Sequence, residues 1–126
     1  MKPKILVVED CCKTRELVTG ILETRGYQVA TAADGYGAVL EFESNKPDLL
    51  ITELTMPSMD GYDLCRIIRA FSSIPIVILT AQQGAEGVFR ALKAGADAFV
   101  PKPLDHGELL VQIEALLAVN PRRAIG

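Results

Sequence analysis

The chain alternates short apolar runs with stretches whose apolar residues recur every three or four positions. A short continuous apolar run is typical of a strand that is buried on both faces of a parallel sheet. Apolar residues at three- and four-residue spacing are typical of a helix with one buried face. The predicted strands cover residues 5–8, 27–31, 47–53, 74–79 and 98–100. The predicted helices cover about 12–25, 62–71 and 85–93, a short segment around 38–42, and a last segment after 105.

The helical stripes also identify the side chains that we expect to pack on the sheet. Gly26 and Gly95 are expected to end two of the helices, and Asp105 to cap the last one. The expected inward-facing residues are Leu17, Val18, Ile21, Leu22, Ala38, Val39, Phe42, Leu64, Ile67, Ile68, Val88, Ala91, Leu92, Leu109, Leu110, Ile113, Leu116 and Leu117. Five strand-then-helix units imply right-handed crossovers and an α/β fold with a parallel sheet covered on both faces.

The composition fits one globular domain. The chain has 126 residues, 49% of them hydrophobic and 23% charged. We expect the domain to cover 1–119, with 120–126 as a C-terminal tail or the start of a linker. A net charge of -3 argues against direct binding of nucleic acid, which needs a basic face. No apolar run approaches the roughly 18 residues of a membrane span, and the N-terminal run ends too soon for an export signal.

The three cysteines indicate the compartment more than the chemistry. Cys11, Cys12 and Cys65 are an odd number and lack metal-ligand spacing. A reducing, cytoplasmic location fits them best. Cys65 is expected to pack on the apolar face of its helix.

Polar side chains gather where the predicted strands end. Glu9 and Asp10 follow the first strand, Glu53 ends the third, Thr80 follows the fourth, and Lys102 follows the fifth. Because carboxyl ends of parallel strands share one edge of the sheet, these side chains should converge there. Converging carboxylates repel one another unless a cation lies between them. A hard divalent ion with oxygen ligands, most plausibly Mg²⁺, meets that need.

Four segments carry a resemblance to a known family. ILVVED, PDLLITELTMPSMDG, IPIVILTA and KAGADAFVPKP are similar to the motifs of response regulator receiver domains of two-component signalling, of the chemotaxis-regulator type. The resemblance covers nearly the whole chain, from Lys4 to about Val119. It implies a flavodoxin-like, doubly wound sheet of five parallel strands in the order 2-1-3-4-5, with five helices.

The resemblance also implies a role for each residue at the strand ends. Glu9 and Asp10 match the acidic pair that holds a weakly bound Mg²⁺, Glu53 stands at the phosphoacceptor position as a further ligand, and the backbone carbonyl of Thr55 completes the protein ligands.

Three residues match those that bind the phosphoryl group or change conformation on activation in the family. Thr80 and Lys102 match the hydroxyl and the ammonium that bind the phosphoryl group. Phe99 matches the aromatic residue whose inward or outward rotamer accompanies activation. Lys102 and Pro103 match the family's usual cis peptide bond.

One residue departs from the family pattern. The phosphoacceptor of the family is an aspartate, and Glu53 occupies that position. One extra methylene moves the carboxylate outward by roughly 1.5 Å, which is enough to slow phosphotransfer by orders of magnitude. We therefore predict that Glu53 is not phosphorylated in the usual way. Glu53 either biases the domain toward an active-like state or simply abolishes phosphorylation. An alternative is that the domain is an ordinary phosphorylatable receiver in which mutagenesis replaced the aspartate by Glu53.

Two other function classes are disfavoured. A Mg²⁺-dependent phosphatase or phosphotransferase would lack a general acid or base, because His106 is the only histidine and begins the last helix. A flavin or nucleotide site would need glycines or hydroxyls where Glu9 and Asp10 present negative charge. The favoured reading is a signalling module and not an enzyme.

The resemblance implies protein partners for such a module. They are a sensor histidine kinase or a downstream effector, with the last two helices and the fifth strand as output surface and homodimer interface. Arg90, Lys93 and Asp97 lie on that surface, either as charged contacts of a homodimer or as solvated charges, and the second reading is preferred.

Overall fold

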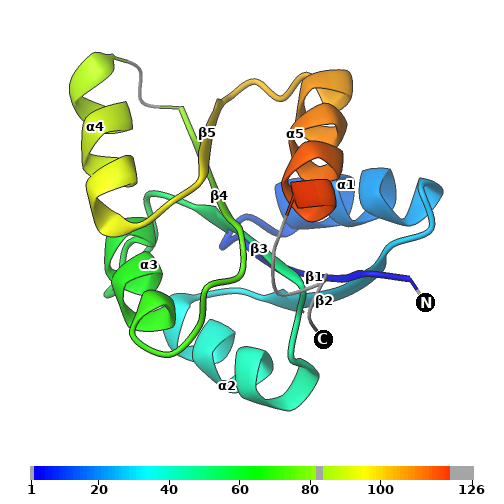
Figure 1. The fold of residues 1–126 in the computed structure, drawn as a ribbon, viewed down its shortest axis with the longest axis horizontal. Coiled ribbons are helices and arrows are strands. Elements are labelled where there is room, and N and C mark those ends of the chain that lie inside the picture. Colours follow the sequence, from blue (N-terminus) through cyan, green and yellow to red (C-terminus); the bar gives the residue numbers. More distant parts are fainter. Residues whose placement is uncertain (1, 82–83, 120–126) are drawn as a thin grey trace.

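The computed structural model describes residues 2–81 and 84–119, so the predicted tail 120–126 lies outside the described residues. Five strands alternate with five helices (Figure 1). The strands are β1 (Lys4–Val8), β2 (Gln28–Ala32), β3 (Leu49–Glu53), β4 (Ile76–Thr80) and β5 (Ala98–Pro101). The helices are α1 (Cys12–Thr24), α2 (Gly35–Asn45), α3 (Gly61–Arg69), α4 (Ala85–Ala94) and α5 (His106–Val119).

All strand pairs are parallel, and the sheet order is β2-β1-β3-β4-β5, as predicted. The register places the carboxyl ends side by side, since Val8 lies opposite Thr52 and Glu53 lies opposite Leu79. The backbone N–H of Lys102 donates to the carbonyl of Thr80 at 2.8 Å, which fixes the start of the loop after β5. The predicted polar residues therefore meet at one edge of the sheet.

The sheet separates two apolar layers, as Figure 1 shows for the helices on its two faces. One layer joins alternate strand residues such as Ile5 and Ile51 to the buried faces of α1 and α5. The other joins Leu50 and Ile78 to α2, α3 and α4. Because β3 and β4 are buried along their whole length, they form a rigid floor under the site.

The two predicted helix-ending glycines and the predicted cap of α5 are confirmed, whereas the helix predicted over about 62–71 ends at Arg69. Gly26 and Gly95 follow α1 and α4 with φ of +83° and +106°, a region that favours glycine. A side chain at Gly95 would also meet Arg69, because a Cβ there would lie 2.7 Å from its Cγ. The Asp105 carboxylate accepts from the backbone N–H of Glu108 at 3.0 Å, which caps α5.

For four side chains, the prediction that they face the sheet is wrong. Leu17 is 49% exposed, Ile67 36%, Val88 37% and Leu92 53%. The strands have four or five residues each, so a helix meets the sheet through a narrow strip. The apolar stripe of a helix can be wider than that strip, and its margins stay in contact with solvent. Each helix among the described residues is too short or too polar to cross a membrane.

Candidate functional site

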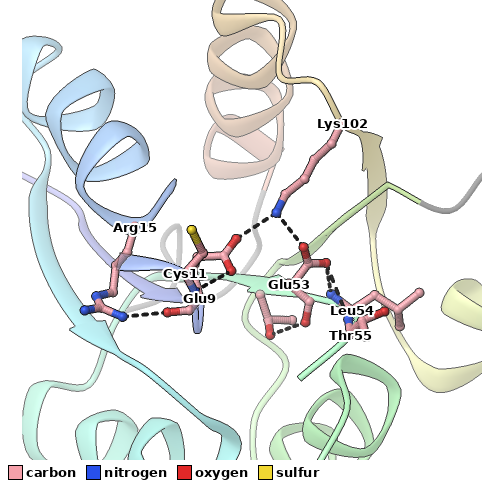
Figure 2. Close-up of polar contacts among 8 residues, drawn as sticks. Glu9, Cys11, Arg15, Glu53, Leu54, Thr55 and Lys102 are labelled. Atoms are coloured by element: carbon pink, nitrogen blue, oxygen red, sulfur yellow. Dashed lines mark hydrogen bonds and ion pairs between the residues drawn. The ribbon is translucent and has the colours of Figure 1, made fainter. Parts of the chain in front are cut away.

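The ends of β1 and β3 and the loop after β5 bring one cation between two acids (Figure 2). The Lys102 ammonium donates to Glu9 Oε1 at 2.8 Å and to Glu53 Oε1 at 2.5 Å. Glu9 is 2% exposed and Glu53 is 8% exposed. Buried carboxylates need compensation by charge or hydrogen bonds. Lys102 supplies the charge, and we name these three side chains the Glu9–Lys102–Glu53 clasp.

Backbone N–H groups hold the other oxygen of each acid. Glu9 Oε2 accepts from the N–H of Cys11 at 3.1 Å. Glu53 Oε2 accepts from the N–H of Leu54 at 2.5 Å and from that of Thr55 at 3.4 Å, so the Glu53 side chain turns back on its own loop (Figure 2). Each of the four carboxylate oxygens of the clasp therefore accepts at least one hydrogen bond.

Two residues that the sequence did not single out hold the acids in place. The Arg15 guanidinium, from the first turns of α1, donates to the Glu9 carbonyl at 2.8 Å. Gly61 begins α3 directly against the end of β3, where a Cβ would lie 2.7 Å from the Glu53 carbonyl oxygen. Gly61 ends one of the four segments that carry the family resemblance, but the need for glycine comes from this close approach.

Burial and ion pairing shift two pKa values in the clasp. Burial raises the pKa of Glu9 above its ordinary value, although hydrogen bonds from Lys102 and the Cys11 N–H oppose the shift. Burial acts to lower the pKa of Lys102, but its hydrogen bonds to Glu53 and Glu9 outweigh burial and raise it. Lys102 is therefore a charged ammonium at neutral pH.

The other predicted site residues lie around the clasp. Asp10 is exposed beside Glu9, and its carboxyl acts to raise the Glu9 pKa. The Thr55 side chain is exposed, whereas Thr80 is buried at the end of β4. Phe99 is half-buried and packs against the layer that includes α3 and α4. The peptide bond between Lys102 and Pro103 is cis, as the resemblance implied.

The clasp residues, as arranged, do not fit a divalent ion. Among residues 2–81 and 84–119, no group of three His, Cys, Asp or Glu side chains could hold a metal. Lys102 takes the place between Glu9 and Glu53 that a shared ion would need. The assignment of Glu9, Asp10, Glu53 and Thr55 as ligands stays a prediction.

Comparison with known proteins gives the family. The sequence model of the response regulator receiver domain matches residues 5–114. This chain belongs to the response regulator receiver domain family. The receiver domain is 38% identical over 120 residues to the DNA-binding response regulator MtrA of Mycolicibacterium paratuberculosis, covering 95% of this chain and 53% of MtrA. It is 40% identical over 116 residues to the probable transcriptional regulator ycf27 of Cyanophora paradoxa, covering 92% of this chain and 48% of ycf27.

Solved structures share the fold of this receiver domain. A two-component response regulator from Clostridium difficile superposes with a TM-score of 0.90 at 30% identity, covering 94% of this chain and 98% of the other. The chemotaxis protein CheY4 of Vibrio cholerae gives 0.86 at 29% identity, covering 92% and 99%. The receiver domain spans about half the length of the curated relatives it matches. The family is one of signalling proteins, in agreement with the prediction.

Proposed function

We propose that this receiver domain is a signalling module in which Glu53 takes the place of the phosphoacceptor and is not phosphorylated in the usual way. The observation that carries the proposal is the pairing of Glu53 with Lys102, by which the acid already contacts the ammonium assigned to the phosphoryl group. The proposal goes beyond the family assignment, which concerns the domain as a whole.

The hydrogen bonds of Glu53 argue against phosphotransfer. An attacking carboxylate oxygen must lie in line with the donor phosphorus, with an available lone pair. Glu53 Oε1 is held by Lys102, and Oε2 is turned back to the N–H groups of Leu54 and Thr55. Each oxygen therefore already shares a lone pair with a donor, which lowers its nucleophilicity and limits the directions from which it can attack.

The same contacts support an active-like bias. Glu53 contacts Lys102 while Thr80 is buried and Phe99 is half-buried. A structure with Thr80 and Phe99 both turned outward, and with no contact between Glu53 and Lys102, would have counted against the bias. A carboxylate has less charge and fewer acceptor atoms than a phosphoryl group, so the bias is partial.

Contacts within the chain bear on the proposed partners. The Arg69 guanidinium donates to Asp97 at 2.6 Å, and the Arg90 guanidinium lies 4.4 Å from the centroid of the Tyr62 ring. Because Asp97 and Arg90 already interact within the domain, we favour an effector protein or a histidine kinase over a charge-paired homodimer. We propose that the domain itself makes no direct contact with nucleic acid, although MtrA is named as DNA-binding.

Phosphorylation with a small-molecule donor tests the proposal. The wild-type domain and a Glu53→Asp variant are incubated with acetyl phosphate and MgCl₂, and their intact masses are measured. We expect a phosphoryl adduct on the variant alone, with Glu53→Gln as a control that gains none. An adduct on the wild type would contradict the proposal, and no adduct on Glu53→Asp would show that more than the acceptor has changed.

Backbone NMR tests the active-like bias separately. The amide shifts of α4 and β5 are compared among wild type, Glu53→Gln, and Glu53→Asp with and without the phosphoryl group. Wild type should resemble phosphorylated Glu53→Asp, and Glu53→Gln should resemble the unphosphorylated form. If wild type instead resembles Glu53→Gln, Glu53 does no more than abolish phosphorylation.

A further inference from the structure

The clasp places a fixed positive charge at the point where two buried acids converge. Lys102 Nζ lies 2.8 Å from Glu9 Oε1 and 2.5 Å from Glu53 Oε1. We propose that the Lys102 ammonium is the resident cation of this pocket and that it keeps Mg²⁺ away from Glu9 and Glu53. The inference deepens the proposed function and rests on it in one respect, that Glu53 carries no phosphoryl group.

The ligand oxygens are already in use. Mg²⁺ requires near-octahedral oxygen ligands at about 2.0–2.1 Å and gives up its waters reluctantly. An ion bound to both Glu9 Oε1 and Glu53 Oε1 would lie close to Lys102 Nζ, which already contacts both oxygens. Binding through the other oxygens would compete with the hydrogen bonds from Cys11 and Leu54. A divalent ion therefore competes with existing contacts of the two acids, whose negative charge Lys102 already partly compensates.

Electrostatic repulsion between the Lys102 ammonium and a divalent ion also disfavours binding of the ion. The Lys102 side chain is 21% exposed, so solvent screens its charge incompletely. Its backbone N–H is bonded to the Thr80 carbonyl at 2.8 Å, which anchors the start of the side chain beside the pocket. A divalent ion near Glu9 would face this ammonium at short range.

Asp10, the third acid predicted as a metal ligand, lies outside the clasp and does not replace Glu9 and Glu53 as ligands. Asp10 is exposed beside Glu9 and is available to a hydrated ion. A single exposed carboxylate holds Mg²⁺ weakly, because Mg²⁺ sites in proteins combine carboxylates with further oxygen ligands. The conformation of the pocket should therefore be independent of divalent ions at millimolar concentration.

Titration with Mn²⁺, followed by water proton relaxation, measures binding directly. Mn²⁺ is suited to the same carboxylate and water ligands as Mg²⁺. Lys102→Met should bind Mn²⁺ at least about tenfold more tightly than wild type, because the acids lose their counter-cation. Lys102→Arg retains the charge and should bind no more tightly than wild type. Lys13→Met removes an exposed lysine from α1 and controls for the change in net charge.

Equal affinity of wild type and Lys102→Met, within about twofold, would overturn the inference. If Lys102→Met does not fold, the midpoint of thermal unfolding of the wild-type protein tests the inference instead. The midpoint should be the same in MgCl₂ as in NaCl of matched ionic strength, since a ligand stabilises the state it binds. A higher midpoint in MgCl₂ would also overturn the inference.

The two proposals fail in different ways. A wild-type domain that binds Mn²⁺ tightly but gains no phosphoryl group from acetyl phosphate contradicts the role of Lys102 and leaves the proposed function intact. A wild-type domain that gains a phosphoryl group contradicts the proposed function, whatever its affinity for Mn²⁺.

Discussion

The clasp and helix α4 are held to the same sheet in different ways. The acids of the clasp are buried and bonded to Lys102 and to backbone N–H groups. Helix α4 buries Ala91 and Ala94, and leaves Phe89 61% exposed and Leu92 53% exposed. The Tyr62 hydroxyl also donates to the Gly87 carbonyl at 3.2 Å, and this bond tethers α4 to α3.

The difference indicates which part of the domain can move with a small cost in free energy. Moving an acid of the clasp would separate buried charges, which costs several kcal/mol. Moving α4 would disturb two small buried side chains and a few polar contacts, so its local stability should be low. A fixed pocket beside a loosely held helix fits a module that transmits a signal through α4.

The largest expected effect comes from truncating the core under the clasp. Leu50 in β3 is fully buried, and Leu50→Ala should lower the free energy of unfolding by about 2–5 kcal/mol. Leu92→Ala on α4 should change it by less than about 0.5 kcal/mol, because Leu92 is 53% exposed. Urea denaturation followed by far-UV circular dichroism measures both variants. Equal losses would remove the contrast between the two regions.

The next effect comes from removing the cation of the clasp. Lys102→Met leaves two buried acids facing each other and should cost roughly 1–3 kcal/mol at pH 7, after allowance for the partial exposure of Lys102. The loss should shrink as the pH falls, because the raised pKa of Glu9 lets this acid take up a proton before an ordinary glutamate does. Lys13→Met, measured by the same urea denaturation, should lose little.

The wild-type clasp should weaken in alkali. Since the folded-state pKa of Lys102 is raised above 10.5, the stability it contributes is fully present below pH 10.5 and is lost at higher pH as the ammonium deprotonates. Urea midpoints of wild type and Lys102→Met measured from pH 8 upward should therefore converge. A constant difference up to the most alkaline point would contradict the shift.

A smaller effect should follow from releasing α4. Tyr62→Phe removes the hydroxyl that donates to Gly87, at a cost of about 1 kcal/mol. Amide hydrogen exchange should speed up in α4 and not in β3. Tyr36→Phe is the matched control, because Tyr36 is 63% exposed on α2. Faster exchange spread evenly over α4 and β3 would mean that the helix is not a separate unit.

The smallest effect concerns the cysteines and leaves the fold intact. Hydrogen bonds from the Thr14 side chain and backbone N–H lower the pKa of Cys11, whereas burial raises the pKa of Cys65 to about 11. With iodoacetamide at pH 8, exposed Cys11 should react first, and buried Cys65 should react after urea is added. Peptide mass spectrometry after timed labelling gives the order, and early labelling of Cys65 would show that α3 opens.

Some features of the site follow from local sequence. The apolar runs identify the strands, because such runs cannot be left in contact with water, and parallel pairing brings their carboxyl ends to one edge. Glu9, Glu53 and Lys102 were predicted to converge on this basis, and they do. His106 was predicted to begin the last helix, and α5 does begin at His106.

Other features needed the folded structure. The apolar stripe of α4 predicted Val88, Ala91 and Leu92 as buried, but α4 buries Ala91 and Ala94 and leaves Val88 and Leu92 exposed. The close approach of Gly61 to the Glu53 carbonyl joins the start of α3 to the end of β3, and it becomes visible when the two elements have packed.

The sequence by itself indicated the family and with it the strand order, the edge of the sheet that carries the polar residues, and the glutamate at position 53. The tertiary structure alone decided that Lys102 joins Glu9 to Glu53 while Asp10 stays exposed. The reason is that hydrophobic burial along a strand is a local pattern that can be read residue by residue. The pairing of charges at strand ends depends on side-chain directions and on loops from distant segments, which are fixed once the chain has packed.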